Sequence, residues 1–175
     1  GGKLKNNKIV VPDVSWATDL SSPLILGMET FVVDCNQEDL SADLHHLEQV
    51  FREEKPAAFI LVSVLGLVPD MDRIVELCNK YDVLLIEDTC ESLGSEFRGK
   101  KLGTFGCMSF FSTYFGHHIS TIEGGMISTN DREINNLLLM IRSHGWDRDL
   151  DEVAAQKLAE ENNIKNFDRL VTFYL

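Results

Sequence analysis

The sequence predicts a three-layer α/β/α fold built on a mixed, mainly parallel sheet. Short apolar runs alternate with amphipathic stretches along most of the 175 residues, and this alternation is typical of repeated strand–helix–strand units. Some of these runs are apolar at every position, as strands are when helices cover both faces of their sheet. The length suits one domain with a substantial core, so we expect a single domain over residues 1–175.

The first third of the chain predicts three strands and two helices. The first strand is closed by Pro12, and Leu47, Val50 and Phe51 give the second helix one apolar face. We expect Ser41 to cap that helix, because its hydroxyl can accept a hydrogen bond from the unpaired amides of the first turn. In order, we expect a strand over 8–11, a helix over 16–27, a strand over 30–34, a helix over 42–51 and a strand over 57–62.

The remainder predicts three more helices and one more buried strand. A helix follows Pro69 and carries apolar side chains at helical spacing from Met71 to Cys78. The run 83–86 is a continuous apolar strand that ends at Glu87 and Asp88. Helices are expected over 132–142 and 149–161. The chain then stops on the apolar residues 171–175, from which we expect a truncated domain.

Composition narrows the class of function. The formal net charge is −12, which argues against nucleic-acid binding, because such proteins present a basic face. No apolar run approaches the roughly 20 residues that span a bilayer, and we expect no membrane association. The absence of a signal-peptide pattern and the wide spacing of the cysteines indicate a cytoplasmic protein with reduced thiols; the cysteines are Cys35, Cys78, Cys90 and Cys107.

Two residues at expected strand ends could contact a ligand. Asp88 directly follows a buried strand, where a partly desolvated carboxylate can hold a protonated ring nitrogen or a metal, or can serve as a helix cap or ion-pair partner. Its neighbour Glu87 points to the opposite face of the strand and is expected to be structural. Trp16 follows the first strand and could either pack in the core or stack on an aromatic ligand.

A second polar cluster covers residues 109–125 and mixes hydroxyls, aromatic rings, two histidines and a Gly-Gly turn. Hydroxyls and free amides can bind a phosphate, and a histidine can move protons near neutral pH. The alternative is a buried hairpin whose histidines are only hydrogen bonded. A zinc site formed by His117, His118 and His144 is disfavoured, because adjacent histidines on a strand point in opposite directions.

Together these segments resemble the DegT/DnrJ/EryC1/StrS family of sugar aminotransferases and dehydratases, which share the aspartate-aminotransferase type I fold. The resemblance covers most of residues 8–146. It implies that the chain is part of the cofactor-binding large domain, without the phosphate-cupping turn before it and the small domain after it. The matching motifs are Val11-Pro12-x-x-Ser15-Trp16, Ile86-Glu87-Asp88 through Ser95, Arg98 through Gly106, Glu123-Gly124-Gly125 and Arg142-Ser143-His144-Gly145.

The resemblance implies pyridoxal 5'-phosphate or pyridoxamine 5'-phosphate as cofactor. Asp88 would then pair with the pyridinium nitrogen and keep it protonated. Trp16 would stack on the ring, and Ser112 would hydrogen bond the phosphate. Glu91 stands where the family often has glutamine or histidine near the ring hydroxyl. The resemblance also implies a homodimer with its active site at the subunit interface. We expect no metal ligand among the site residues.

The main departure from the family pattern is His117. Most members have lysine six residues before the glutamate of the Glu-Gly-Gly motif, here Glu123, and that lysine binds the cofactor covalently. Imidazole cannot form this Schiff base. Within the family, histidine at this place marks the sugar 3-dehydratases. The resemblance therefore implies that His117 is the catalytic base in the loss of the 3-hydroxyl from a nucleotide-linked 4-keto-6-deoxy sugar.

Two other hypotheses stay open. The chain could be a sugar aminotransferase whose lysine has been lost or moved, in which case a lysine-linked adduct should survive borohydride reduction. It could also be a non-catalytic relative that keeps the fold for assembly or ligand binding, and would then take up no cofactor. Dinucleotide binding is disfavoured, because no G-x-G-x-x-G follows any expected strand.

Overall fold

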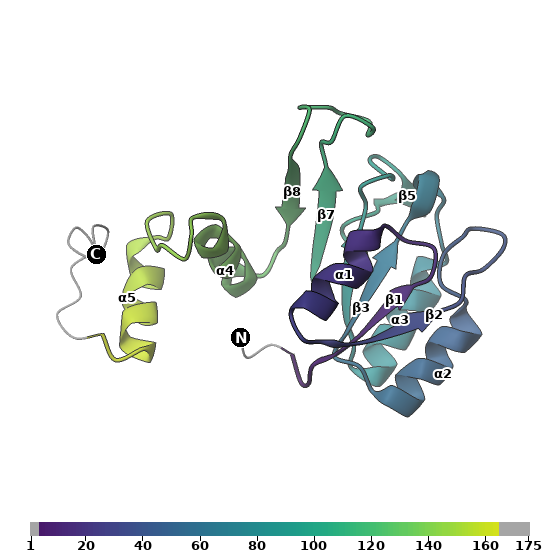
Figure 1. Cartoon of the computed structure of the whole chain (residues 1–175), viewed down its shortest axis with the longest axis horizontal. Helices are drawn as coiled ribbons and strands as arrows, with labels where there is room; N and C mark the ends of the chain where they lie inside the picture. The colour runs from purple at the N-terminus through teal and green to yellow at the C-terminus, as the bar shows by residue number, and fades with distance from the viewer. Residues whose placement is uncertain (1–3, 165–175) are drawn as a thin grey trace. The chain divides into compact units, whose positions relative to one another are not determined.

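The computed structural model describes residues 4–164, so the apolar end at 171–175 lies outside the described residues. The chain forms two compact units, Gly1–Ser128 and Thr129–Leu175 (Figure 1). Among the described residues, no helix combines the length and apolar character needed to cross a membrane.

The first unit is built on a six-stranded sheet in the order β2-β1-β3-β4-β7-β8. All neighbouring strands run parallel except β8, which is antiparallel to β7. This confirms the predicted mixed, mainly parallel sheet. The strands are β1 (Lys8–Pro12), β2 (Glu29–Val33), β3 (Ala58–Val62), β4 (Leu84–Asp88), β7 (Met108–Ser112) and β8 (Gly125–Ser128), with β5 (Glu96–Phe97) and β6 (Lys100–Lys101) forming a separate small hairpin.

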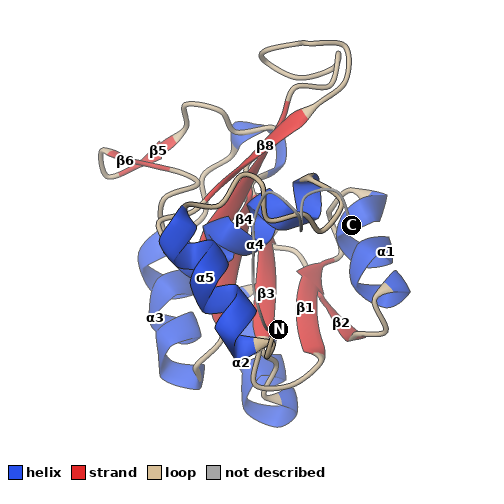
Figure 2. Ribbon diagram, turned by 90° about the vertical axis from the view of Figure 1, so that its left-hand side faces the viewer, coloured by secondary structure: helices blue, strands red, loops and turns tan. Residues whose placement is uncertain are grey.

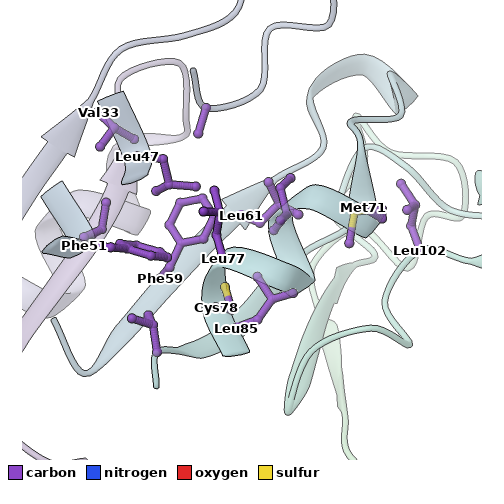
Figure 3. Packing of buried hydrophobic residues seen from close by; sticks show 14 residues of the cluster. Val33, Leu47, Phe51, Phe59, Leu61, Met71, Leu77, Cys78, Leu85 and Leu102 are labelled. Atoms are coloured by element: carbon purple, nitrogen blue, oxygen red, sulfur yellow. The ribbon is translucent and has the colours of Figure 1, made fainter. Parts of the chain in front are cut away.

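Helices lie on both sides of this sheet (Figure 2). Helices α2 (Leu44–Glu54) and α3 (Met71–Tyr81) cover one face, and α1 (Ala17–Ile25) lies on the other. A short 3₁₀ turn, η1 (Val64–Gly66), follows β3. The larger core lies under α2 and α3 (Figure 3), with Phe51 and Phe59 in edge-to-face contact at 5.9 Å between ring centroids.

Alternation along the strands divides the core into two clusters. Phe59, Leu61 and Leu85 belong to the cluster beneath α2 and α3, whereas Ile60 and Ile86 belong to the cluster on the opposite face. Successive side chains of a strand point to opposite faces. The two carboxylates that end β4 continue this alternation, so they are directed to different sides of the sheet.

The second unit contains α4 (Arg132–Arg142) and α5 (Glu152–Glu161). The predicted start of α5 at residue 149 was wrong. Asp151 caps the helix by accepting a hydrogen bond from the amide of Ala154 at 2.8 Å. Asp149 is instead bound by the hydroxyl of Ser143 at 2.7 Å and by Arg142 at 2.8 Å, which holds it outside the helix.

The expected cap of α2 was also wrong. Asp43, not Ser41, occupies the N-cap, and its Oδ1 accepts a hydrogen bond from the amide of His46 at 2.8 Å. The hydroxyl of Ser41 is buried and has no hydrogen-bond partner within residues 4–164. The helix therefore starts two residues later than predicted, because the better acceptor lies at residue 43.

We predict that Asp43→Ala lowers the free energy of unfolding by about 1 kcal/mol, since it leaves an amide of the first turn of α2 unpaired. Ser41→Ala is the matched control and should cost less, because within residues 4–164 the Ser41 hydroxyl makes no hydrogen bond. Urea denaturation of both variants measures the difference. A larger loss for Ser41→Ala would contradict the assignment of the cap.

Candidate functional site

The candidate site lies at the edge of the sheet where the parallel strands end, which is where ligands bind in such sheets. Val62, at the end of β3, stands beside Asp88 at the end of β4. On its other side, Asp88 pairs with Phe110 of β7. Ser112, which ends β7, lies two residues after Phe110. Segments far apart in the sequence therefore meet at Asp88.

Asp88 is buried, with only 8% of its surface exposed. Its Oδ1 accepts a hydrogen bond from the amide of Cys90 at 2.9 Å. Burial, together with a hydrogen bond to Asp88, raises the pKa of the Cys90 thiol and keeps it protonated. Within residues 4–164, Asp88 forms no ion pair with lysine, arginine or histidine. A buried carboxylate without a cation is poised to bind one.

Asp19 is a site residue that the sequence reasoning missed. It lies in the first turn of α1, where its Oδ2 accepts a hydrogen bond from the amide of Trp16 at 3.2 Å. It is buried, with only 7% of its surface exposed. Burial, reinforced by the neighbouring charge of Asp88, raises the pKa of Asp19 to about 7. An acid three residues after an N-cap is a capping signal that the sequence shows. That signal does not reveal that the side chain of Asp19 is buried.

Trp16 and Ser112 lie at the same edge of the sheet as Asp88. Trp16 is the N-cap of α1 and is 73% exposed, so it is not packed in the core and its indole face is open to a ligand. Ser112 ends β7, and its Oγ accepts a hydrogen bond from the amide of Tyr114 at 3.2 Å. A hydroxyl that accepts in this way can still donate its own hydrogen to a phosphate oxygen.

Glu91 lies in the turn after β4 and fixes the loop that follows β3. Its Oε2 accepts a hydrogen bond from the amide of Leu65 at 2.7 Å. Leu65 has a φ of 54°, a left-handed conformation that costs energy for a non-glycine residue. The Glu91 carboxylate therefore stabilises a strained loop at the edge of the sheet, beside the place where a ligand would bind.

His117 lies in the loop that joins β7 to β8. The hairpin continues beyond the strands through backbone hydrogen bonds from Thr113 to Gly124 and from Phe115 to Ile122. His117 is half-buried, and its ring lies 6.2 Å from that of Tyr114 in an edge-on arrangement. Across the described residues, no hydrogen bond or ring contact joins its side chain to Asp88, Trp16, Ser112 or Glu91.

This segment is a hairpin, as the alternative interpretation expected, but it is an exposed one. Phe115 and Ile122 are 68% and 76% exposed. His117 and His118 lie in the loop and not on a strand, so the argument that strand alternation separates them does not apply. Within residues 4–164, no group of three histidine, cysteine or acidic side chains is arranged to hold a metal ion.

Glu87 is structural, as predicted. It is 1% exposed, and its carboxylate accepts hydrogen bonds from the backbone amides of Gly103, Phe105 and Gly106, each at 2.6 Å. These contacts fasten the turn that precedes β7 to β4. Because charge-assisted bonds are about twice as strong as neutral ones, they fix β7 next to Asp88.

A family model described as the DegT/DnrJ/EryC1/StrS aminotransferase family matches residues 2–171. The chain belongs to this family. Members named as dehydratases and as aminotransferases both occur among its relatives. The GDP-4-keto-6-deoxy-D-mannose 3-dehydratase of Yersinia pseudotuberculosis is 36% identical over 171 residues, which is 98% of this chain and 43% of that protein. The GDP-perosamine synthase of Caulobacter vibrioides is 31% identical over 81% of this chain and 38% of its own length.

Solved structures of family members have the same fold. The Escherichia coli GDP-4-keto-6-deoxy-D-mannose 3-dehydratase with bound hydrated pyridoxal phosphate has a TM-score of 0.74 and 39% identity, covering 85% of this chain and 38% of that one. A Helicobacter pylori aminotransferase involved in pseudoaminic acid biosynthesis has a TM-score of 0.74 at 29% identity, covering 79% of this chain and 37% of that one. The chain thus spans about two fifths of the length of these relatives.

We predict that Glu87→Gln lowers the free energy of unfolding by about 2–4 kcal/mol, because the new amide group replaces an acceptor oxygen in front of backbone donors. The exposed Glu96→Gln is the matched control and should change stability by less than about 0.5 kcal/mol. Chemical denaturation of both variants provides the measurement. Equal stability of the two variants would contradict the role of Glu87.

A second prediction follows from the raised pKa of Asp19. The folded chain holds a proton on Asp19 up to about pH 7, whereas the unfolded chain loses it near the ordinary value of 3.8. Stability should therefore fall between about pH 4 and pH 7. Asp19→Asn cannot titrate, so its stability relative to wild type should rise over this interval by on the order of 4 kcal/mol. A relative stability that is equal at pH 4.5 and pH 8 would contradict this.

Proposed function

We propose that the chain is the cofactor-binding part of a pyridoxal-phosphate-dependent sugar 3-dehydratase in nucleotide-sugar biosynthesis, with His117 as its catalytic base. The observation that carries the proposal is the buried Asp88 at the carboxyl edge of a parallel sheet, which has no basic partner among residues 4–164. Two relatives named GDP-4-keto-6-deoxy-D-mannose 3-dehydratase, from Yersinia pseudotuberculosis and Escherichia coli, support the choice of reaction at 36% and 40% identity.

The residues at the site fit the cofactor. Asp88 can bind a protonated ring nitrogen through a charge-assisted hydrogen bond. The exposed indole of Trp16 offers a flat apolar surface to the ring, and the Ser112 hydroxyl can donate to the phosphate. Glu91, held at one oxygen by Leu65, keeps a second oxygen for the ring hydroxyl. The bound cofactor supplies an electron sink for carbanion chemistry.

His117 supplies proton transfer in this account. Imidazole is the side chain best suited to accept and return a proton near neutral pH. The turn that begins at Tyr114 holds its backbone, with the His117 amide donating to the Tyr114 carbonyl at 3.0 Å. Within residues 102–156 the sequence has no lysine, and Lys100 and Lys101 are exposed on β6. A covalent link to the cofactor therefore has no lysine donor in the hairpin.

The substrate class and the assembly belong to the same proposal. A nucleotide-linked 4-keto-6-deoxy sugar is supported by the names of the dehydratase relatives, which specify a GDP-linked sugar. We propose a homodimer, and the exposed apolar side chains of the β7–β8 hairpin support it. Within residues 4–164 the four cysteines form no disulfide, which supports a location in the reducing cytoplasm. Neither nucleic acid nor membrane is a proposed partner.

A sugar aminotransferase is the second candidate function. The GDP-perosamine synthases of Caulobacter vibrioides and Escherichia coli O157:H7, each 31% identical to this chain, favour it. An aminotransferase needs a lysine that can bind the cofactor covalently. Borohydride reduction of the chain with pyridoxal phosphate followed by peptide mapping separates the two functions, since a single lysine-linked adduct would favour the aminotransferase.

We predict that Asp88→Asn weakens the binding of pyridoxamine phosphate by about 30- to 150-fold, because a charge-assisted contact of roughly 2–3 kcal/mol is lost. Titration followed by tryptophan fluorescence gives the dissociation constants. The matched control is Asp13→Asn, which makes the same charge change at the exposed end of β1 and should bind as wild type does. Unchanged binding by Asp88→Asn would refute the cofactor site.

His117→Lys tests the position of residue 117. This variant should bind pyridoxal phosphate covalently, with a visible absorption band that borohydride abolishes, because the lysine amine can form the Schiff base that imidazole cannot. His118→Lys is the matched control in the same loop and should show no such band. A band in the control alone would assign the reactive position to residue 118.

A further inference from the structure

Two threonines close the neck of the loop that carries His117 and joins β7 to β8 (Figure 1). Thr113 directly follows β7, and Thr121 lies across the hairpin from it, where its amide donates to the Thr113 carbonyl at 2.9 Å. The two hydroxyl oxygens lie 2.8 Å apart, and the Thr121 hydroxyl oxygen lies 2.9 Å from the carbonyl oxygen of Glu123. Residues 114–120 therefore form a loop whose ends are joined by backbone and side chains, and His117 is its middle residue.

The two hydroxyls form a hydrogen-bonded chain with one direction. A threonine hydroxyl has a single hydrogen to donate, although it can also accept, and a carbonyl oxygen can only accept. Both contacts are satisfied only if the Thr121 hydroxyl donates to the Glu123 carbonyl and the Thr113 hydroxyl donates to Thr121. Because β-branched side chains are stiff about χ1, ordering the two threonines costs little side-chain entropy.

Gly124 leaves the space in which this threonine pair, Thr113 and Thr121, can meet. Its φ is +140°, and a Cβ on it would stand 2.7 Å from the Thr113 hydroxyl oxygen and 3.2 Å from that of Thr121. Its carbonyl also accepts a hydrogen bond from the Thr113 amide at 2.9 Å. The first glycine of the Glu-Gly-Gly motif therefore packs directly against the threonine pair.

The imidazole of His117 has no polar contact of its own to hold it. Among residues 4–164 its ring forms no hydrogen bond or ion pair, and its aromatic neighbour is Tyr114, edge-on at 6.2 Å between ring centroids. The backbone amide of His117 donates to the Tyr114 carbonyl at 3.0 Å. The place of the imidazole therefore depends on the path of the loop backbone, and that path depends on how the neck is closed.

We propose that Thr113 and Thr121 are positioning residues for His117: their paired hydroxyls fix the neck of the loop and so hold the imidazole in the orientation needed for proton transfer. This inference rests on the proposed function, because it concerns the placement of the proposed base. Neither threonine touches the reacting atoms or carries the proton. Rates fall steeply when a reacting group is misplaced by about 1 Å, so the order of this loop has a kinetic consequence.

The test uses the His117→Lys variant, whose amine reports the place of residue 117 through the rate at which the visible band with pyridoxal phosphate appears. The dependence of this rate on cofactor concentration separates the dissociation constant from the first-order rate constant of the covalent step. We expect Thr121→Val in this background to lower the first-order constant by about 3- to 10-fold, the effect of losing an ordinary hydrogen bond, and to leave the dissociation constant unchanged. Thr121→Ser keeps the hydroxyl and should restore the rate.

Thr30→Val in the same background is the matched control. The Thr30 hydroxyl donates to the carbonyl of Met28 at 3.4 Å, on β2 at the other end of the sheet from β8, and its loss should not change the rate. Equal first-order constants for Thr121→Val and its parent would overturn the proposal, as would a loss that Thr121→Ser does not restore. A parent His117→Lys that forms no band would instead refute the proposed function.

A second measurement needs no cofactor and keeps His117 in place. ¹⁵N relaxation reports the motion of backbone amides on the ps–ns timescale. We expect the amides of residues 114–120 to become more mobile in Thr121→Val than in the wild-type chain, and to regain wild-type order in Thr121→Ser, whereas the amides of β7 stay as they are in wild type. Equal order of the loop in wild type and Thr121→Val would overturn the proposal whatever the result with the cofactor.

Discussion

The site depends on the alternation of two adjacent carboxylates at the end of β4. Glu87 points toward the side where the turn 103–106 supplies three backbone amides to its carboxylate. Asp88 points to the opposite side, where it meets Asp19 and no basic side chain of the described chain. One strand thus ends in an acid whose carboxylate accepts three backbone hydrogen bonds and in another whose carboxylate is buried without a basic partner in residues 4–164.

Contacts on both faces of β4 hold the elements of the site in place. By fastening the turn before β7, Glu87 aligns β7 beside β4, so that Asp88 stands opposite Phe110 and the strand runs on to Ser112. On the other face, the capping contact between Asp19 and the Trp16 amide fixes the start of α1. The residues proposed to stack on the ring, to pair with its nitrogen and to bind the phosphate therefore all lie at the same edge of the sheet, around the end of β4.

Sequence reasoning predicted the parts of the fold that local patterns determine. Apolar runs located β1 to β4 to within one or two residues, and the alternation rule separated Glu87 from Asp88. It was wrong where two polar residues competed for one role: Asp43 caps α2 although Ser41 was the expected cap. It missed Asp19 because an acid in the first turn of a helix normally faces solvent, whereas α1 packs on the sheet and Asp19 is buried. Such long-range contacts leave no local signal.

The central claim is that Asp88 holds a protonated ring nitrogen. The most direct measurement is ¹⁵N NMR of ring-labelled pyridoxamine phosphate bound to the chain, followed from neutral to alkaline pH. The account predicts that the bound nitrogen stays protonated at pH values where the nitrogen of the free ligand has lost its proton, because the buried carboxylate stabilises the cation. A bound nitrogen that titrates as it does in free solution would contradict the account.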